Sequence, residues 1–351
     1  MGEDAEFGDP DAVGNTGLGA TGSDGSSVTG SDGSSVTGSD GSSATGSDGA
    51  ALPATPNRES VRSLVESPDE AGTVVWHRED LRIADNPALA AAVDAETDDS
   101  DDDTASRVLP LFVFDPAFYD DRGMACDARV EFLHDSLRDL DRQYRDVGTP
   151  GLTYAHGDPI AVLDDFVDAG WSVVATDGPT GRYGLRRDNR ARERLGVRFV
   201  AGDGLVRDAD RPRANWKESV ESWLAAEPHD WDPRSVTVER LDTGVTPQAI
   251  AAAYGVKSSK SMIPDGGRAA GRERLASFVA RIGDYPGNIS SPVDARGGTS
   301  GLSPYLRFGC LSVREVHRHV DEHAPDGRGK SMFVSRLFWN LHYRQKLLDW
   351  P

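Results

Sequence analysis

From Thr73 onward, short apolar runs alternate with segments of helical periodicity, and this alternation leaves few folds open. A strand followed by a helix and then another strand, repeated several times, is typical of a parallel α/β sheet. Strands are predicted over residues 73–76, 108–114, 152–155, 172–176 and 197–200. Residues 73–201 are therefore expected to form a five-stranded, parallel, Rossmann-like α/β domain.

Helical periodicity fills the intervals between these strands. It is clearest over residues 128–147, where apolar side chains recur at steps of three and four and form one stripe. Asn86 followed by Pro87 is a typical helix start. Residues 202–265 show no sustained period and are interpreted as a connector with short helices. Residues 266–351 are expected to begin an all-α domain, with helices predicted over residues 272–281, 313–323 and 331–349.

Residues 1–72 contain an eight-residue repeat, SDGSSVTG, which begins at Ser23 and Ser31 and recurs in altered form from Ser39. Gly, Ser, Asp and Thr at this density offer too little apolar surface to offset the entropy of ordering the backbone. The segment also lacks the basic start and the apolar run of a secretory signal. We therefore expect a disordered acidic tail.

The formal net charge of −20 argues at first against a nucleic-acid partner, because phosphates repel an acidic surface. Residues 1–72 hold 13 acidic and 2 basic side chains, however, and residues 94–103, interpreted as a solvated loop, hold 7 acidic and no basic ones. The remainder is close to neutral and has five arginines within residues 186–194, which leaves room for a local basic face. Abundant Asp with only five Lys suggests adaptation to high salt, with plain acidity as the alternative.

Cys126 and Cys310 are the only cysteines, and they lie far apart in the sequence. A disulfide framework and a four-cysteine metal or iron-sulfur site are thus excluded within this chain, and no metal ligands are predicted. No apolar run approaches the roughly 18 residues of a membrane helix. We expect a soluble, cytoplasmic monomer with no membrane partner.

The first motif, WHREDLRIADNPALAAA, follows the first predicted strand and covers residues 76–92. Nucleotide-binding α/β domains usually carry glycines at this place, so that the backbone can approach a phosphate. None occurs here, which argues against a dinucleotide dehydrogenase or a pyrophosphate-splitting synthetase. A simpler interpretation of Arg78, Glu79, Asp80 and Arg82 is that they pair with one another at the edge of the sheet.

The second motif, TSGLSPYLRFGCLS, covers residues 299–312. Ser303 before Pro304 is predicted to cap one helix, and Ser312 with Glu315 is predicted to form a capping box for the next. A helix start surrounded by hydroxyl groups is also a ready anion site, so the same residues could hold a pyrophosphate. Two capped helices without a ligand remain the alternative.

The third motif, MFVSRLFWNLHYRQKLLDWP, covers residues 332–351. On a helix, Phe333, Leu337, Phe338 and Leu341 share one side and are predicted to be core residues. A second face carries two aromatic residues flanked by two cations. The aromatic rings could stack against an unstacked base, and the cations could bind phosphate. The members of this face are Arg336, Trp339, Tyr343 and Lys346. A solvated or buried amphipathic helix is the alternative.

Together these motifs resemble those of the DNA photolyase and cryptochrome flavoproteins, over nearly all of residues 73–351. The first resembles the family stretch WFRRDLRxxDNPAL, with departures at His77 and Glu79. The second resembles the family's flavin pyrophosphate loop, TSxLSPYLxxGxLS. This resemblance implies FAD-binding roles for one upstream tyrosine and four loop residues, namely Tyr285, Thr299, Ser300, Leu302 and Ser303.

The third motif resembles the family's ELxWREFYR helix, whose tryptophan packs against the flipped DNA lesion. Trp339 and Arg344 match it, whereas Arg336 replaces the glutamate and Asn340 replaces the arginine that follows the tryptophan. Damaged DNA is thus the implied partner, with the exact substrate left open by the two departures.

The resemblance implies a deoxyribodipyrimidine photo-lyase, in which reduced FAD excited by blue light donates an electron to a pyrimidine dimer and recovers it after the ring splits. No catalytic side chain is expected, because the cofactor carries the chemistry. The α/β domain is expected to hold an antenna pigment, a deazaflavin or a folate. The former is favoured, since the DGPTGRYGLRRD stretch around Tyr183 has no carboxylate at the place where a folate contact is expected.

Two alternatives stay open, namely a cryptochrome-like blue-light photoreceptor and an inactive truncated copy. The helical FAD-binding domain of the family continues beyond the point matched by Pro351. An incomplete helical domain, an exposed apolar side on the last helix and weak FAD binding are therefore expected.

Overall fold

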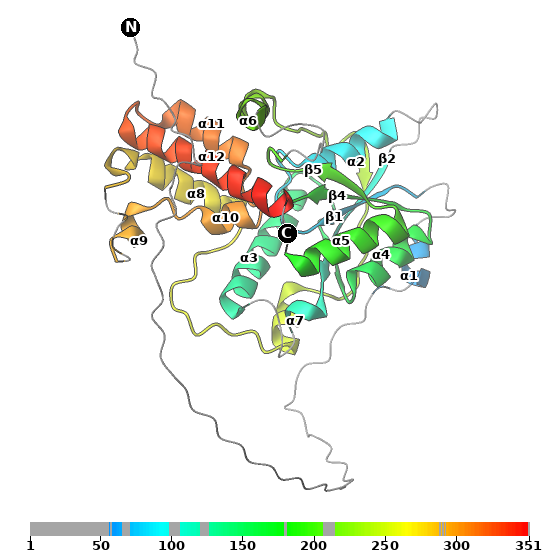
Figure 1. Ribbon diagram of the computed structural model, residues 1–351. Coiled ribbons are helices and arrows are strands. Elements are labelled where there is room, and N and C mark those ends of the chain that lie inside the picture. Colours follow the sequence, from blue (N-terminus) through cyan, green and yellow to red (C-terminus); the bar gives the residue numbers. More distant parts are fainter. Residues whose placement is uncertain are drawn as a thin grey trace, which may run out of the picture. The chain divides into compact units, whose positions relative to one another are not determined.

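Figure 1 shows the computed structural model of the chain. It describes residues 58–64, 71–97, 106–119, 126–178, 181–205, 215–287 and 293–349, together with Pro56, Ile289 and Ser291. All of these residues belong to the compact unit Ser47–Pro351. The repeats of the tail and most of the acidic insert lie outside the described residues.

The sheet confirms the five predicted strands and adds a sixth. Five parallel strands run in the order β3-β2-β1-β4-β5, namely β1 (Thr73–His77), β2 (Ser106–Phe114), β3 (Thr153–His156), β4 (Ser172–Asp177) and β5 (Arg198–Ala201). The sixth, β6 (Val236–Val238), comes from the expected connector and pairs in parallel with the first residues of β2. The strand order reverses between β1 and β4, which opens a crevice at their carboxyl ends.

Helices cover both faces of this sheet (Figure 1). One face, with Val75 and Phe112, packs against α2 (Pro87–Thr97) and α3 (Asp127–Asp146). The other, with Val74 and Leu111, packs against α4 (Pro159–Val167) and α5 (Arg182–Leu195). The central strands are therefore buried on both sides, which explains why they appear in the sequence as continuous apolar runs.

The predicted stripe of α3 is largely confirmed. Val130, Leu137, Leu140 and Tyr144 are buried, whereas Val147 is 39% exposed because the helix ends one residue before it. The start of α2 is confirmed as well, since the Asn86 side chain accepts the Leu89 backbone N–H at 3.0 Å. Contrary to the loop expected over residues 94–103, the helix α2 runs to Thr97.

The expectation of disorder throughout residues 1–72 is wrong for one segment. Residues 58–62 form helix α1 (Arg58–Arg62), in which Val61 is fully buried in the core below α4. The Arg58 guanidinium pairs with three carboxylates, those of Asp164, Asp165 and Asp168. The burial of Val61 and the ion pairs of Arg58 thus stabilise a helix that the composition of residues 1–72 did not predict.

The connector contains two short helices, as expected, α6 (Trp216–Ala225) and α7 (Pro247–Ala253). The segment after them is all-α, as predicted. It contains α8 (Arg268–Val279), a 3₁₀ turn η4 (Ile282–Asp284), α9 (Ala295–Gly298), α10 (Ser303–Arg307), α11 (Val313–His323) and α12 (Arg328–Asp349). In Figure 1, α11 lies beside α12, and it also contacts α8.

The capping predictions for this segment have different outcomes. Ser312 caps α11, because its hydroxyl accepts the Glu315 backbone N–H at 2.9 Å. Ser303, in contrast, is the first residue of α10, and the cap position belongs to Leu302. Leu302 is 1% exposed and belongs to the core that α8, α11 and α12 share with the sheet.

Candidate functional site

The largest of three described cavities, about 420 Å³ in volume, opens at the carboxyl ends of β1 and β2. Its lining combines aromatic rings with guanidinium groups. The rings belong to Trp76, Phe112, Phe114, Phe118, Tyr119, Tyr183 and Phe308, and the guanidinium groups to Arg78, Arg129, Arg187 and Arg307. This combination suits a planar molecule with an acidic group, since rings offer stacking surfaces and arginines bind carboxylate or phosphate.

Asp115, directly after β2, places a carboxylate in this cavity. One of its oxygens accepts the Ala117 backbone N–H at 3.0 Å, and the other accepts the Tyr183 hydroxyl. Burial and this hydrogen bond raise the pKa of Tyr183, so the phenol stays protonated at neutral pH. Residues 178–187 around Tyr183 include no carboxylate, but the fold brings Asp115 to Tyr183 from 68 positions earlier in the sequence. The sequence argument against a folate is therefore wrong in its premise.

The inner side of the cavity is uncharged near Tyr119. The Tyr119 hydroxyl lies 3.0 Å from Nε2 of His134. Burial, with help from the nearby Arg138 cation, lowers the pKa of His134 to about 4. Both partners are thus neutral at physiological pH, and the charges of the cavity are concentrated on its arginines and on Glu79 and Asp115.

The charged loop after β1 lies in the crevice where the strand order reverses. Arg78 donates to the Asp188 carboxylate and to the Thr176 carbonyl, each at 2.5 Å, and Glu79 pairs with Arg307 of α10. The simpler interpretation of the first motif, in which its charges pair with one another, is therefore wrong, because Arg78 and Glu79 pair with residues of α5 and α10 instead. These contacts also tie the sheet to the second motif.

Asp80 remains ionised in this loop despite its burial. Burial alone would raise its pKa, but the adjacent His77 and the hydrogen bonds donated by the Arg78 backbone and the Thr176 hydroxyl more than offset that effect. The pKa of Asp80 therefore lies well below its ordinary value. A permanent negative charge is thus fixed beneath the arginines of the crevice.

A second buried carboxylate, Asp203, joins the sheet to the helical segment. It accepts one guanidinium N–H from Arg82 and one from Arg344 of α12, each at 3.0 Å. Arg344, one of the residues that match the third family motif, therefore points toward the α/β domain. Sequence analysis missed this junction because its partners lie 121 and 141 positions apart, and no local pattern links them.

The loop predicted to hold the flavin diphosphate is built around polar backbone contacts. The Thr299 carbonyl accepts an N–H from Arg281 at 3.0 Å, and the Ser300 carbonyl accepts one from Arg274 at 2.8 Å. Ser303 is exposed. Two guanidinium groups beside an exposed hydroxyl fit a diphosphate, because they supply positive charge and donors. Neither arginine was singled out from the sequence.

Other details of the loop limit which atoms can take part. The Leu302 side chain is buried in the core, so only its backbone is available to a ligand. Gly301 has φ +67°, a left-handed backbone conformation that favours glycine. Tyr285 is half-buried with its ring edge-on to Phe278, at 5.6 Å between centroids. None of the five predicted residues lines the three described cavities.

The four residues predicted to bind DNA all lie exposed on α12. Trp339 is 41% exposed and Tyr343 is 58% exposed, and their ring centroids are 5.8 Å apart with planes inclined by 31°. Arg336 and Lys346 extend the same face at spacings of three residues. On the opposite side Phe333, Leu337 and Leu341 are buried, as predicted, whereas Phe338, also predicted to be a core residue, is half-buried.

The basic stretch of α5 is less available to bind phosphate, because three of its arginines are paired within the protein. Arg187, Arg190 and Arg192 pair with the carboxylates of Asp188, Asp158 and Asp177. Among the described residues, no cluster of three or more His, Cys, Asp or Glu could hold a metal ion. In the same part of the chain, no helix is both long and apolar enough to span a membrane.

Comparison with known proteins agrees with this architecture. Residues 73–210 match the family model of the DNA photolyases. The chain is 28% identical over 297 residues to the deoxyribodipyrimidine photo-lyase of Halobacterium salinarum, covering 78% of this chain and 60% of that protein. It is also 28% identical over 284 residues to cryptochrome DASH of Natronomonas pharaonis, covering 72% of this chain and 56% of that protein.

Solved structures show the same fold. A class III photolyase from Agrobacterium tumefaciens superposes with a TM-score of 0.62 at 22% identity, covering 82% of this chain and 60% of that one. An archaeal photolyase from Sulfolobus tokodaii, solved with two FAD molecules, gives a TM-score of 0.57 at 23% identity, covering 78% and 58%. The chain thus spans about 60% of the length of the curated relatives it matches. Residues 73–210 thus match the DNA photolyase family, and the described chain as a whole is similar in sequence and fold to the DNA photolyases and cryptochromes.

Proposed function

We propose that this chain takes part in light-driven repair of pyrimidine dimers in DNA, as a deoxyribodipyrimidine photo-lyase. In such a reaction, reduced FAD excited by blue light supplies an electron to the dimer and takes it back after the ring has split. The contribution of the protein is to bind and orient the cofactor and the lesion.

The observation that carries the proposal is the aromatic face of α12. Trp339 and Tyr343 are large rings left exposed side by side, with Arg336 and Lys346 next to them. An extruded base gains about 1–3 kcal/mol by stacking on an aromatic side chain, while cations bind the backbone phosphates. A dimer is extruded more readily than normal bases because its pairing is already weakened.

For the cofactor, we assign the diphosphate to the loop over residues 299–303. Arg274 and Arg281 hold the loop carbonyls and provide positive charge, and the Ser303 hydroxyl is free to donate from the exposed side. Tyr285 would pack beside the cofactor from its half-buried position.

The 420 Å³ cavity of the α/β domain is the proposed antenna site. Its rings and arginines suit a planar pigment with an acidic tail, and the Asp115 carboxylate is an acceptor for ring N–H groups. A deazaflavin and a folate both fit this description. Reconstitution with each pigment separately, followed by gel filtration and absorbance, distinguishes them, and an Asp115→Asn variant should weaken the folate more than the deazaflavin.

The repair proposal is tested with an oligonucleotide that carries one thymine dimer. The full chain is mixed with FAD and a reductant and exposed to blue light or kept dark, and the remaining dimer is measured by chromatography. Loss of the dimer only in the light supports the proposal. Equal dimer content in light and dark, with no preference for dimer-containing over undamaged DNA in a binding assay, contradicts it.

A cryptochrome-like photoreceptor is the second candidate. It is favoured by Arg336 and Asn340, which replace the glutamate and arginine of the family motif; the Asn340 side-chain oxygen is buried without a hydrogen-bond partner. A photoreceptor should show a light-dependent spectral or conformational change without dimer loss. The same illuminated sample therefore decides between the two.

A further inference from the structure

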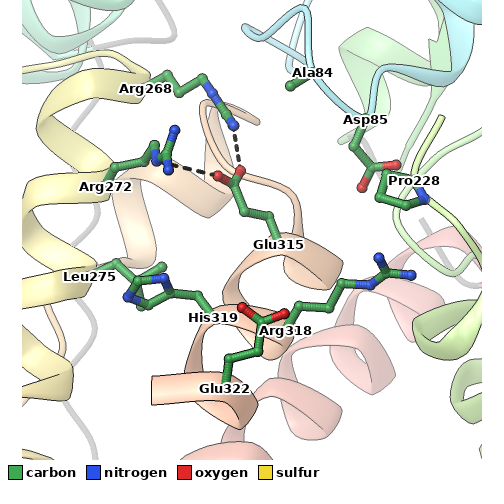
Figure 2. A pocket seen from close by; sticks show the side chains of 10 residues that line it. All are labelled: Ala84, Asp85, Pro228, Arg268, Arg272, Leu275, Glu315, Arg318, His319 and Glu322. Atoms are coloured by element: carbon green, nitrogen blue, oxygen red, sulfur yellow. Dashed lines mark hydrogen bonds and ion pairs between the residues drawn. The ribbon is translucent and has the colours of Figure 1, made fainter. Parts of the chain in front are cut away.

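A second pocket lies between α8, α11 and the turns at residues 84–85 and 228, with a volume of about 260 Å³. None of its lining residues belongs to the loop over residues 299–303 or to the aromatic face of α12. Figure 2 shows Asp85 and Pro228 on one side and Arg268, Arg272 and Leu275 on the other, with the α11 side chains between them. Its volume suits a ligand smaller than a typical drug-sized molecule.

Asp85 has an unused hydrogen-bond acceptor in this pocket. Its side chain is 7% exposed, and Oδ1 accepts the Arg314 guanidinium at 2.8 Å and the His229 backbone N–H at 3.0 Å. Oδ2 is buried without a hydrogen-bond partner. Asp85 also has φ +51°, a left-handed conformation that is uncommon outside glycine. A buried carboxylate oxygen in this state favours a ligand with an N–H donor, above all a protonated amine.

Two guanidinium groups of the same pocket can bind an acidic group of a ligand. Arg272 is 65% exposed and lies 3.8 Å from Glu315, beyond hydrogen-bonding distance. Arg318 donates to the Ala226 carbonyl at 2.7 Å and meets the exposed Glu227 at 3.4 Å. A guanidinium has five N–H donors, so each of these groups can still bind an acidic ligand.

The charges of the pocket balance. Its lining has three arginines and three carboxylates, namely Arg268, Arg272, Arg318, Asp85, Glu315 and Glu322. Glu315 is already held by Arg268 and lies 3.8 Å from Arg272, and the dashed lines of Figure 2 mark both ion pairs. Burial, followed by the neighbouring His323, lowers the pKa of His319, so this ring adds no charge at neutral pH. A neutral pocket with separated charges disfavours a simple cation or anion and favours a molecule that carries both.

We propose that this pocket binds a small zwitterion, with an amine donating to Asp85 Oδ2 and a carboxylate bound by Arg272 and Arg318. Ala84, Pro228 and Leu275 supply an apolar wall for the carbon chain between the two groups. This site is independent of the proposed repair function.

The test is a series of unbranched ω-amino acids from glycine to 6-aminohexanoate, titrated into the full chain by calorimetry. An alkylamine and an alkyl carboxylate of each length are the single-function controls. We expect one chain length to bind at least tenfold more tightly than either control. Equal binding of the amino acids and their controls, or no binding by any of them, overturns the proposal.

Variants locate the site. Arg272→Gln changes an exposed side chain and Arg318→Gln a half-buried one, and each should weaken binding of the best ligand at least tenfold. Arg234→Gln is the matched control, because Arg234 is 88% exposed and does not line the pocket. Asp85→Asn should abolish the preference for the amine, with its fold checked by circular dichroism because Asp85 also holds Arg314. Unchanged binding by both Arg272→Gln and Arg318→Gln overturns the assignment whatever Asp85→Asn does.

Discussion

Replacing Asp203 with Asn tests how much the buried charge at the junction between α12 and the sheet contributes to the free energy of unfolding. The Asp203 side chain is 5% exposed and Arg82 is 2% exposed, so the pair is screened little by water. Asn keeps the size of the side chain and one oxygen but removes the charge. Breaking a buried pair costs about 3–5 kcal/mol, because the remaining ion is left uncompensated. We expect the lower end, since Arg82 also donates to the carbonyls of Asp85 and Gly309.

The assay is urea unfolding followed by far-UV circular dichroism. With a denaturant slope of about 1–3 kcal/mol/M, a loss of about 3 kcal/mol lowers the midpoint by roughly 1–3 M. Asp232→Asn is the control, because its partner Arg234 is exposed and such surface pairs contribute little. Coinciding midpoints for Asp203→Asn and Asp232→Asn would refute the reasoning.

The same carboxylate predicts a pH dependence. Burial alone would raise the pKa of Asp203, but Arg82 and Arg344 outweigh it, so the pKa is lowered in the folded chain. The stabilisation is therefore complete above the unfolded pKa of about 3.9 and is lost as the pH falls through the folded value. The difference in stability between wild type and Asp203→Asn should be full at about pH 6 and shrink below about pH 4.

Three further outcomes are expected. Gly309→Ala should destabilise the chain more than Gly196→Ala in thermal unfolding. Both glycines have φ +64°, but only at Gly309 would a Cβ meet backbone, 2.1 Å from the Glu79 carbonyl oxygen. Equal losses of stability in the two variants would contradict this steric argument. Trp339→Ala should weaken binding of dimer-containing DNA by about 1–3 kcal/mol, or roughly 5- to 150-fold, in a gel-shift assay, while Met262→Ala, also an exposed apolar side chain, should not. His134 should titrate near pH 4 by NMR. Because this folded-state pKa lies below the unfolded value of about 6.5, the burial of His134 should reduce stability progressively as the pH falls from about 6.5 to about 4. A normal titration near pH 6.5 would contradict the buried placement of this ring.

Local signals predicted the parts of the fold that depend on local physics. Helix α11 has the predicted bounds because the Ser312 cap sets its start within the sequence itself. The two faces of α12 followed from spacings of three and four residues, and Trp339 and Leu341 lie on the predicted sides. The central strands were recognised because burial on both faces produces continuous apolar runs.

Features that depend on distant partners could not be predicted in this way. Strand β6 has only three residues and is defined by pairing with β2, and α1 depends on carboxylates about 106 positions away. The Asp203 junction and the contact between Asp115 and Tyr183 likewise join residues far apart in the chain. The last of these bears on the antenna site, because it brings the Asp115 carboxylate to Tyr183, whose sequence neighbours over residues 178–187 include no carboxylate.

The most direct test of the central claim is a comparison of FAD and riboflavin binding by wild type and Ser303→Glu, measured by flavin fluorescence. A carboxylate at this exposed position should repel the diphosphate, whereas riboflavin has none. Wild type is predicted to bind FAD saturably. In Ser303→Glu the affinity for FAD should fall at least tenfold, while riboflavin binding stays unchanged. Ser331→Glu, which changes another exposed serine, should bind both flavins as wild type does. Equal FAD affinity in wild type and Ser303→Glu, or no saturable FAD binding by wild type, would contradict the assignment of residues 299–303 as the flavin loop.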